Sequence, residues 1–305
     1  MANIDSFKKS LLDSEITMAL TDIVRDLDAP QEPDYIAALV RNFPEKLREI
    51  LTRNISSFDF RVCGCFIHQK PLAEFIDPKF SDMPSPEIGD LLIVYKEIDG
   101  TDAKYNALLL QAKVIKSNSA KTADALHQLV LYTQWPHFKY KRAGHLNGKE
   151  RDIYPKTIHS GAQYLLINNG MGKTSFGCAT ANKSLNVSLS FAEQLIKLIE
   201  FQVGDIFVSN TGSTIDDWSK MIWDLLEISR DSKFNRRKAG FIGAERLCGD
   251  KLEELNAIVQ KGDAIEALIN MLNGDCFEIN KGGNPGISLI CIEGKRNTMD
   301  DPGKL

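Results

Sequence analysis

Two apolar segments of the chain carry polar residues whose types and spacing suit phosphodiester hydrolysis. Asp90 precedes the run 91–97 (LLIVYKE), while Gln111 and Lys113 lie inside the run 105–115 (YNALLLQAKVI). An Asp-Gly turn separates the two runs, which predicts a hairpin whose arms bring Asp90 and Gln111 side by side. Gln111 and Lys113 are two positions apart and therefore share one face of a strand. A carboxylate and a carboxamide offer oxygen ligands to a hard cation, and an ammonium can orient water or offset charge in a transition state.

The same three residues also have a purely structural interpretation. Lys113 can extend its ammonium to solvent from a strand edge, and Gln111 can make a structural hydrogen bond. Residue type and spacing alone leave both interpretations open.

The elements around this hairpin predict an α/β fold. A helix over 34–53, with Pro44 starting a new turn, is followed by a strand over 58–67, the hairpin, a helix over 123–134 and a strand over 162–168. Further on, the sequence predicts helices over 191–201, 215–228 and 251–272, then two strands over 276–280 and 287–293. We therefore expect a mixed α/β region over 1–190, including N-terminal helices, and a mainly helical region over 191–305 with a terminal β-hairpin. The second region would serve recognition or oligomerisation.

This order of elements resembles the PD-(D/E)xK nuclease superfamily, whose restriction-endonuclease-like fold has a mixed sheet flanked by helices. The resemblance covers roughly residues 34–170. It matches a helix with acidic residues to Glu45 and Glu49, the central acid to Asp90, and the (D/E)xK element to Gln111-Ala112-Lys113. Gln111 departs from the usual acid, and a QxK form is similar to that of Mrr-type restriction enzymes and related anti-phage nucleases.

The resemblance implies a Mg²⁺-dependent endonuclease that cleaves DNA in prokaryotic restriction or anti-phage defence, with Mn²⁺ as a substitute. Asp90, the Gln111 oxygen and the Ala112 carbonyl would bind the metal ion, and Glu45 or Glu49 would complete the site. Lys113 would activate the attacking water. Because Gln111 removes one negative charge, the alternative is a catalytically weakened protein of this fold that binds nucleic acid or acts as a partner subunit.

Charge distribution supplies the candidate contacts to nucleic acid. The formal net charge of the chain is −4, yet residues 104–156 hold ten basic residues against three acidic ones. A local basic segment suggests a face for an anion, although a solvated lysine-rich loop has the same composition. The candidate nucleic-acid contacts are His68, Lys70, Gln128, Lys139, Lys141, Arg142, Arg236 and Arg237.

Sequence patterns argue against a nucleotide-binding P-loop, a zinc site, secretion and a membrane span. The segment 170–174 (GMGKT) resembles part of a P-loop, but the phosphate-binding motif needs glycine where the chain has Ile167. The six cysteines form no CxxC pair, which argues against a zinc knuckle and favours reduced thiols in a cytoplasm. The N-terminus lacks the pattern of a secretory signal, and no apolar run reaches the ~18 residues of a membrane span. We expect a cytoplasmic protein that is not bound to a membrane and whose partner is DNA. Duplex cleavage by this fold usually uses two sites, so the resemblance implies a homodimer. A helper ATPase or a regulatory subunit is a further candidate partner.

Overall fold

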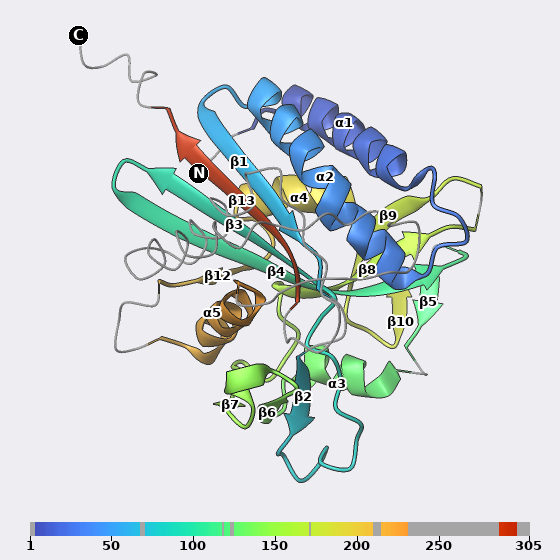
Figure 1. Ribbon diagram of the computed structural model, residues 1–305, viewed down its shortest axis with the longest axis vertical. Coiled ribbons are helices and arrows are strands. Elements are labelled where there is room, and N and C mark those ends of the chain that lie inside the picture. The colour runs from blue at the N-terminus through green and yellow to red at the C-terminus, as the bar shows by residue number, and fades with distance from the viewer. Residues whose placement is uncertain are drawn as a thin grey trace, which may run out of the picture.

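The computed structural model describes residues 4–67, 71–117, 119–122, 125–170, 172–209, 215–230 and 287–297. It is an α/β structure in which helices flank a mixed eight-stranded sheet (Figure 1). The helices are α1 (Ser6–Val24), α2 (Glu32–Asn54), α3 (Leu126–Gln134), α4 (Phe191–Ile199) and α5 (Asp217–Arg230). The strands of the large sheet are β1 (Phe58–Cys65), β3 (Leu91–Asp99), β4 (Asp102–Ile115), β8 (Ala162–Asn168), β9 (Ser175–Thr180), β11 (Leu189–Ser190), β12 (Asp205–Phe207) and β13 (Ser288–Arg296).

The other strands form two smaller sheets. The strand β2 (Leu72–Phe75) pairs with β6 (Phe138–Lys141), and β6 pairs with β7 (Glu150–Arg151). The strand β5 (Ser119–Lys121) pairs with β10 (Ser184–Asn186). A short 3₁₀ helix, Gly144–Leu146, lies between β6 and β7.

The predicted hairpin is present and forms the middle of the large sheet. Strands β3 and β4 are antiparallel, with Asp99 opposite Asp102 across a two-residue turn at Gly100, whose φ of +63° is readily adopted by glycine. Residues 91–95 of β3 and 105–112 of β4 are all buried. Burial on both faces explains why these strands are continuous apolar runs rather than alternating patterns.

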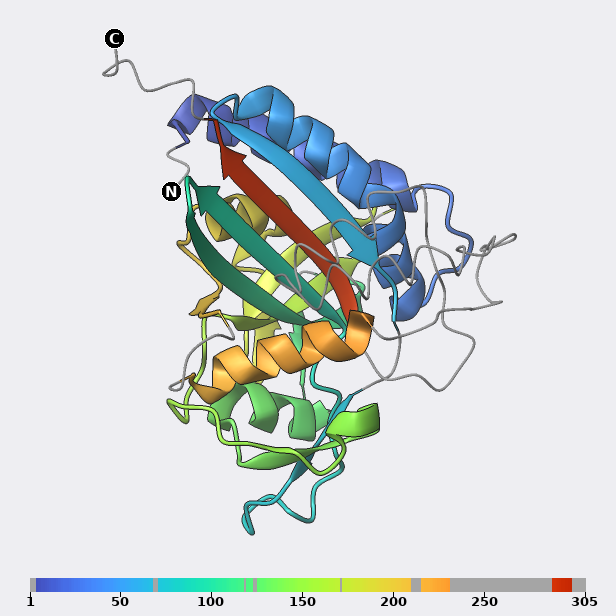
Figure 2. The same cartoon turned by 60° about the vertical axis from the view of Figure 1, so that its left-hand side comes forward.

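The order of strands differs from a simple meander of consecutive strands. The sheet runs β1-β13-β3-β4-β8-β9-β11, so that β13 lies between β1 and β3 (Figure 2). It is antiparallel to β1 and parallel to β3. A strand more than 190 positions further along the chain thus separates β1 from the β3–β4 hairpin.

Three of the elements predicted for the C-terminal region are among the described residues. Helices α4 and α5 and strand β13 correspond to the predicted elements over 191–201, 215–228 and 287–293. The predicted helix over 251–272 and strand over 276–280 lie outside the described residues. The proposed division near residue 190 stays a prediction, although β13 contributes to the sheet of the N-terminal part.

Opposite faces of the sheet are covered by different helices. Asn106 of β4 donates a hydrogen bond to the Leu198 carbonyl of α4 (3.0 Å), while the ring of the preceding Tyr105 contacts Trp223 of α5. Because consecutive strand residues point to opposite faces, α4 and α5 lie on opposite sides of the sheet. Helix α2 lies on the α4 side, where Gly64 of β1 touches Val40 so closely that a Cβ would lie 1.9 Å from its carbonyl oxygen.

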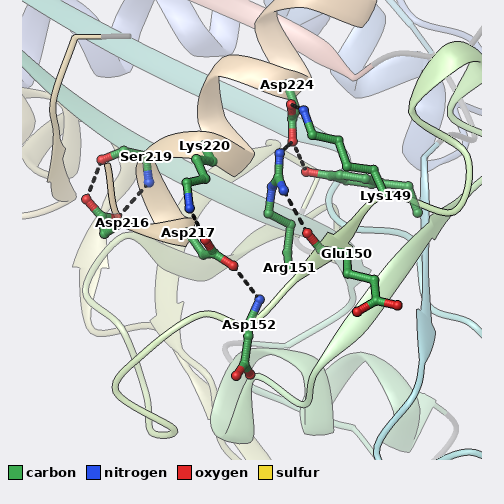
Figure 3. A network of polar contacts seen from close by, with 10 residues as sticks. Lys149, Glu150, Arg151, Asp152, Asp216, Asp217, Ser219, Lys220 and Asp224 are labelled. Atoms are coloured by element: carbon green, nitrogen blue, oxygen red, sulfur yellow. Dashed lines mark hydrogen bonds and ion pairs between the residues drawn. The ribbon is translucent and has the colours of Figure 1, made fainter. Parts of the chain in front are cut away.

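A buried polar network attaches the small β2-β6-β7 sheet to α5 (Figure 3). The carboxylate of Asp224 accepts hydrogen bonds from the Tyr140 hydroxyl (2.9 Å) and the Lys149 ammonium (2.8 Å), and it also pairs with Arg151. The Asp152 amide donates to Asp217 at 2.7 Å. Arg151 and Asp224 are both buried, and each neutralises the charge of the other, because either charge would be costly to bury alone.

Candidate functional site

The residues that the sequence singled out meet where β3 begins, beside the far end of β4. The Asp90 amide donates to the Leu110 carbonyl (2.9 Å), which continues the pairing of the two strands. Oδ2 of Asp90 accepts hydrogen bonds from the Ala112 amide (2.8 Å) and from the Gln111 side chain. The predicted juxtaposition of Asp90 and Gln111 is thus confirmed.

Lys113 joins these residues on the same face of β4. It is partly buried, and its charge favours the ionised forms of the Asp90, Glu87 and Glu32 carboxyls, which opposes the rise in pKa that burial causes in each. One ammonium therefore acts on three carboxyl groups, two from the segment before β3 and one from the start of α2.

Glu32 comes to this site from the first residue of α2. Its carboxylate accepts a hydrogen bond from the Val114 amide, directly after Lys113. Pro33 follows at the start of the helix, a position that proline favours because its missing N–H has no partner there. Burial raises the pKa of Glu32 above its usual value, with Lys113 opposing and Glu87 adding to the rise.

Glu87 approaches from the segment before β3, where it pairs with Leu72 of β2 in an isolated bridge. Burial raises its pKa, and a hydrogen bond with Asp90 and the charges of Lys113 and Arg142 oppose the rise. Asp90 is the most perturbed of the three carboxyls. Its burial, followed by the nearby charges of Glu32 and Glu87, raises its pKa well above the usual value.

The three raised pKa values have one physical meaning. A partly buried carboxyl loses hydration, and neighbouring carboxylates repel one another, so the cluster is favoured when it gains a proton or a cation. Perturbed carboxyls in a cleft are typical of functional sites, although structural clusters show them too.

Aromatic residues support the cluster from the side of α3. The Tyr132 hydroxyl donates to the Ile88 carbonyl (2.9 Å), and the Trp135 ring stacks on Tyr132. Gly89 lies under this contact, where a Cβ would be 2.7 Å from Leu109 and 3.1 Å from the Tyr132 oxygen. Packing of this kind fixes the segment that carries Glu87 and Asp90.

Helix α3 also brings His127 to the site, and Gln128 is the next residue of the helix. His127 is partly buried, and its burial and the nearby charge of Lys113 lower its pKa. It is therefore mostly neutral near pH 7. Gln128 is partly buried, and its Oε1 has no hydrogen-bond partner within the described part of the chain. The sequence prediction included Gln128 as a nucleic-acid contact but assigned no role to His127.

The helix acids that the sequence favoured do not reach the site. Glu45 and Glu49 are exposed on α2. Glu45 is thirteen residues from Glu32, which separates them by about 20 Å along the helix. The assignment of Glu45 or Glu49 to the metal site is not supported by their positions. The acid next to Asp90 is Glu32, which sequence analysis missed because it placed the start of the helix at residue 34. The Glu-Pro pair at 32–33 is typical of the first turn of a helix and could have indicated this earlier start.

Several predicted nucleic-acid contacts are engaged within the chain. Lys139 and Lys141 lie 3.5 and 3.9 Å from the two carboxylate oxygens of Glu74. Five of the ten basic residues of 104–156 pair with carboxylates, namely Lys139, Lys141, Lys149, Arg151 and Lys156. Half of the basic residues in this segment are thus balanced by carboxylates, four of them by Glu74 or Asp224, which lie outside it.

The other predicted contacts have different outcomes. Arg142 is exposed, and its charge acts on Glu87 at the edge of the site. His68, Lys70, Arg236 and Arg237 lie outside the described residues.

The donor set suits a hard cation only in part. Among the described residues, no three histidine, cysteine, aspartate or glutamate side chains are already arranged to hold a metal ion. However, a cavity of about 10 Å³, lined by Glu32 and Asp90 among others, has room for one water-sized species. The Oε1 atom of Gln111 is buried without a partner in the part of the chain that the structure describes. Mg²⁺ usually binds through one or two carboxylates and substrate phosphate rather than in a complete protein cage, so these oxygen atoms fit it.

Comparisons with known proteins find no match to this chain: no protein-family model, curated protein or solved structure matches it. None of the helices in the described ranges is long and apolar enough to cross a lipid bilayer.

Proposed function

We propose that this protein is a Mg²⁺-dependent endonuclease that cleaves DNA phosphodiester bonds, with Asp90, Gln111 and Lys113 at its active site. The observation that carries the proposal is the convergence of these three residues with Glu32 at one end of the β3–β4 pair. The resemblance to PD-(D/E)xK nucleases supports the substrate class and a role in restriction or anti-phage defence.

Each side chain has a role that its surroundings support. Asp90, Gln111 Oε1, the Ala112 carbonyl and Glu32 would hold Mg²⁺, which, when bound, polarises the phosphate and lowers the pKa of a coordinated water. Lys113 would orient the attacking water and offset negative charge as it develops on the phosphate. Glu32 replaces the exposed Glu45 and Glu49 as the helix acid in this proposal.

Two features of the site bear on proton movement. His127, held mostly neutral beside Lys113, is a candidate to accept a proton from water or to pass it to solvent. The Tyr132 hydroxyl is committed to the Ile88 carbonyl, and burial raises its pKa well above the usual value. Tyr132 therefore serves to position the Asp90 segment rather than to exchange protons.

A second candidate function is favoured by Gln111, which stands where the resemblance expects an acid. In this alternative the protein binds nucleic acid, or acts as a partner subunit, with little cleavage of its own. Gln111 in place of an acid weakens the attraction for a divalent cation, which is the chemical basis of this alternative.

Cleavage of supercoiled plasmid with Mg²⁺ or Mn²⁺ tests the proposal. We expect metal-dependent nicking or linearisation that falls at least about 10²-fold in Lys113→Ala and in Asp90→Ala, the usual cost of removing an electrostatic catalytic group. Lys46→Ala, an exposed lysine on α2, is the control and should cleave normally. Salt-sensitive DNA binding without cleavage would support the alternative.

A further inference from the structure

A second cavity lies between the connection from α1 to α2 and the turn from β8 to β9. Its volume is about 670 Å³, within the ~300–1,000 Å³ of typical small-molecule sites. None of Asp90, Gln111 and Lys113 lines it, so it is distinct from the candidate nuclease site. Most of the residues that line the cavity come from α1, the α1–α2 connection and the β8–β9 turn.

The two walls of this cavity differ in chemistry. The α1–α2 wall includes the apolar side chains of Met18, Leu27 and Pro30 beside polar side chains of α1. The β8–β9 wall is polar and includes Lys173 and Thr174. A ligand that satisfies both walls has a body that packs against apolar side chains and an anionic end.

The charges around the cavity favour an anion. Asp22 and Arg25 both line it, and they form an ion pair with each other. The remaining charged side chain of the lining is Lys173, which leaves a net positive charge. Lys173 is followed by the Thr174 hydroxyl and preceded by Gly172, whose φ of +74° turns the backbone sharply. A lysine and a hydroxyl in a glycine-containing turn commonly contact phosphate, even though Ile167 excludes a complete P-loop.

The cavity is also attached to both elements that hold the nuclease site. The Asn169 side chain donates to the Tyr35 hydroxyl (3.3 Å), three residues after Glu32 on α2, and the Asn169 amide donates to the Ile115 carbonyl of β4 (3.1 Å). Gly170 presses against the end of β4, where a Cβ would lie 2.1 Å from the Lys116 carbonyl oxygen. A ligand bound at this turn is therefore linked by direct contacts to α2 and to β4.

We propose that this cavity binds a nucleoside phosphate, with the base against Met18, Leu27 and Pro30 and the phosphate at Lys173 and Thr174. The same chemistry is offered by a free nucleotide and by the 5′-terminal nucleotide of a strand. Binding here does not depend on the proposed nuclease function.

Isothermal titration calorimetry on the full chain tests this site without any cleavage step. The probes are AMP, GMP and ADP, inorganic phosphate, and one short oligonucleotide with and without a 5′-phosphate, all with EDTA present. We expect a dissociation constant in the micromolar range that weakens at least tenfold in Lys173→Ala. Lys183→Ala, which removes an equally exposed lysine beyond β9, is the matched control and should bind like the wild type.

A second variant tests the apolar wall. Met18 is 65% exposed, so Met18→Glu should fold, and its carboxylate should weaken nucleotide binding by a similar factor. Asp90→Ala should bind as the wild type does, which separates this result from a failure of the nuclease proposal.

The outcomes divide clearly. Lys173-dependent binding of free nucleotides supports the site with a free ligand, and binding of only the 5′-phosphorylated oligonucleotide supports it with a strand end. The proposal is overturned by an absence of binding, by inorganic phosphate binding as tightly as any nucleotide, or by equal losses in Lys173→Ala and Lys183→Ala.

Discussion

The side-chain amide of Gln111 donates a hydrogen bond to Oδ2 of Asp90, across 21 positions of sequence. The same oxygen accepts the Ala112 amide at 2.8 Å. Two donors on one carboxylate oxygen hold the Asp90 side chain in a single orientation and leave its other oxygen for a different partner. A carboxylate held in this way is already positioned to act as a ligand.

The helix acid of the site is expected to be Glu32. Glu32→Gln should reduce metal-dependent cleavage at least about tenfold. Glu32 and Asp90 are the two carboxylates that line the small cavity, and the substitution removes one of them. Glu45→Gln, on the exposed part of the same helix, should leave cleavage unchanged. The measurement is the initial rate of plasmid nicking as a function of Mg²⁺ concentration. Equal rates for Glu32→Gln and wild type would remove Glu32 from the site.

Asp90 is expected to lower the stability of the metal-free protein. Since burial and the charges of Glu32 and Glu87 raise its pKa, the folded state binds more protons than the unfolded state. The free energy of unfolding therefore falls as the pH rises above the usual carboxyl pKa of about 4. In EDTA at pH 7, Asp90→Asn should raise the free energy of unfolding by about 0.5 to 2 kcal/mol, a common gain where function constrains a residue.

Urea unfolding at pH 5 and pH 7.5 checks this prediction about Asp90. The advantage of Asp90→Asn over wild type should be larger at pH 7.5, and Mg²⁺ should stabilise the wild type only. A variant that is less stable than wild type at both pH values would show that the charge of Asp90 is not the source of the effect.

The Arg151–Asp224 pair is expected to be important for stability. Asp224→Ala leaves the buried Arg151 without its carboxylate and removes the acceptor of the Tyr140 hydroxyl, which should cost about 3 to 5 kcal/mol. Glu74→Ala, which removes the exposed partner of Lys139 and Lys141, should cost less than about 1 kcal/mol. Chemical denaturation of both variants measures the difference. Similar losses would mean that the buried network contributes no more than a surface pair.

His159 is expected to make the free energy of unfolding fall as the pH rises above about 6.5. It is buried between the rings of Trp135 and Trp218, and its ring nitrogens face the Asp205 carboxylate (3.1 Å) and the Pro155 carbonyl (3.0 Å). Burial alone would lower its pKa, but these two acceptors raise the pKa above the usual 6.5, because only the imidazolium can donate to both. This stabilisation is present below about pH 6.5 and is lost as the pH rises through the raised pKa.

Replacement of His159 tests the link to pH. His159→Gln should destabilise the protein by about 2 kcal/mol at pH 6, the scale of a hydrogen bond to a charged group, and by less at pH 9. Thermal or urea unfolding at the two pH values gives the difference. His145→Gln, which alters an exposed pair with Glu227, is the control and should show little change. A loss that is the same at pH 6 and pH 9 would reflect packing against the two tryptophans alone.

The local parts of the candidate site were predictable from the residues themselves. A two-residue turn sets the register of a hairpin, and the register decides which side chains are neighbours. The hairpin of β3 and β4 therefore brings Asp90 to Gln111, and the period of a strand places Lys113 on the same face. Long apolar runs and helical spacing likewise predicted β8, α2 and α4.

Tertiary packing decided the remainder. All of α2 has helical geometry, so spacing within it cannot show whether Glu32 or Glu45 meets the sheet. That depends on where the helix crosses the strands. The apolar run of β13 is equally compatible with any neighbour, and only the assembled sheet places it between β1 and β3. The basic segment also looked free because its main partner, Asp224, lies more than seventy positions away from Arg151. Contacts between distant segments form only when the core closes, and no local pattern in the chain records them.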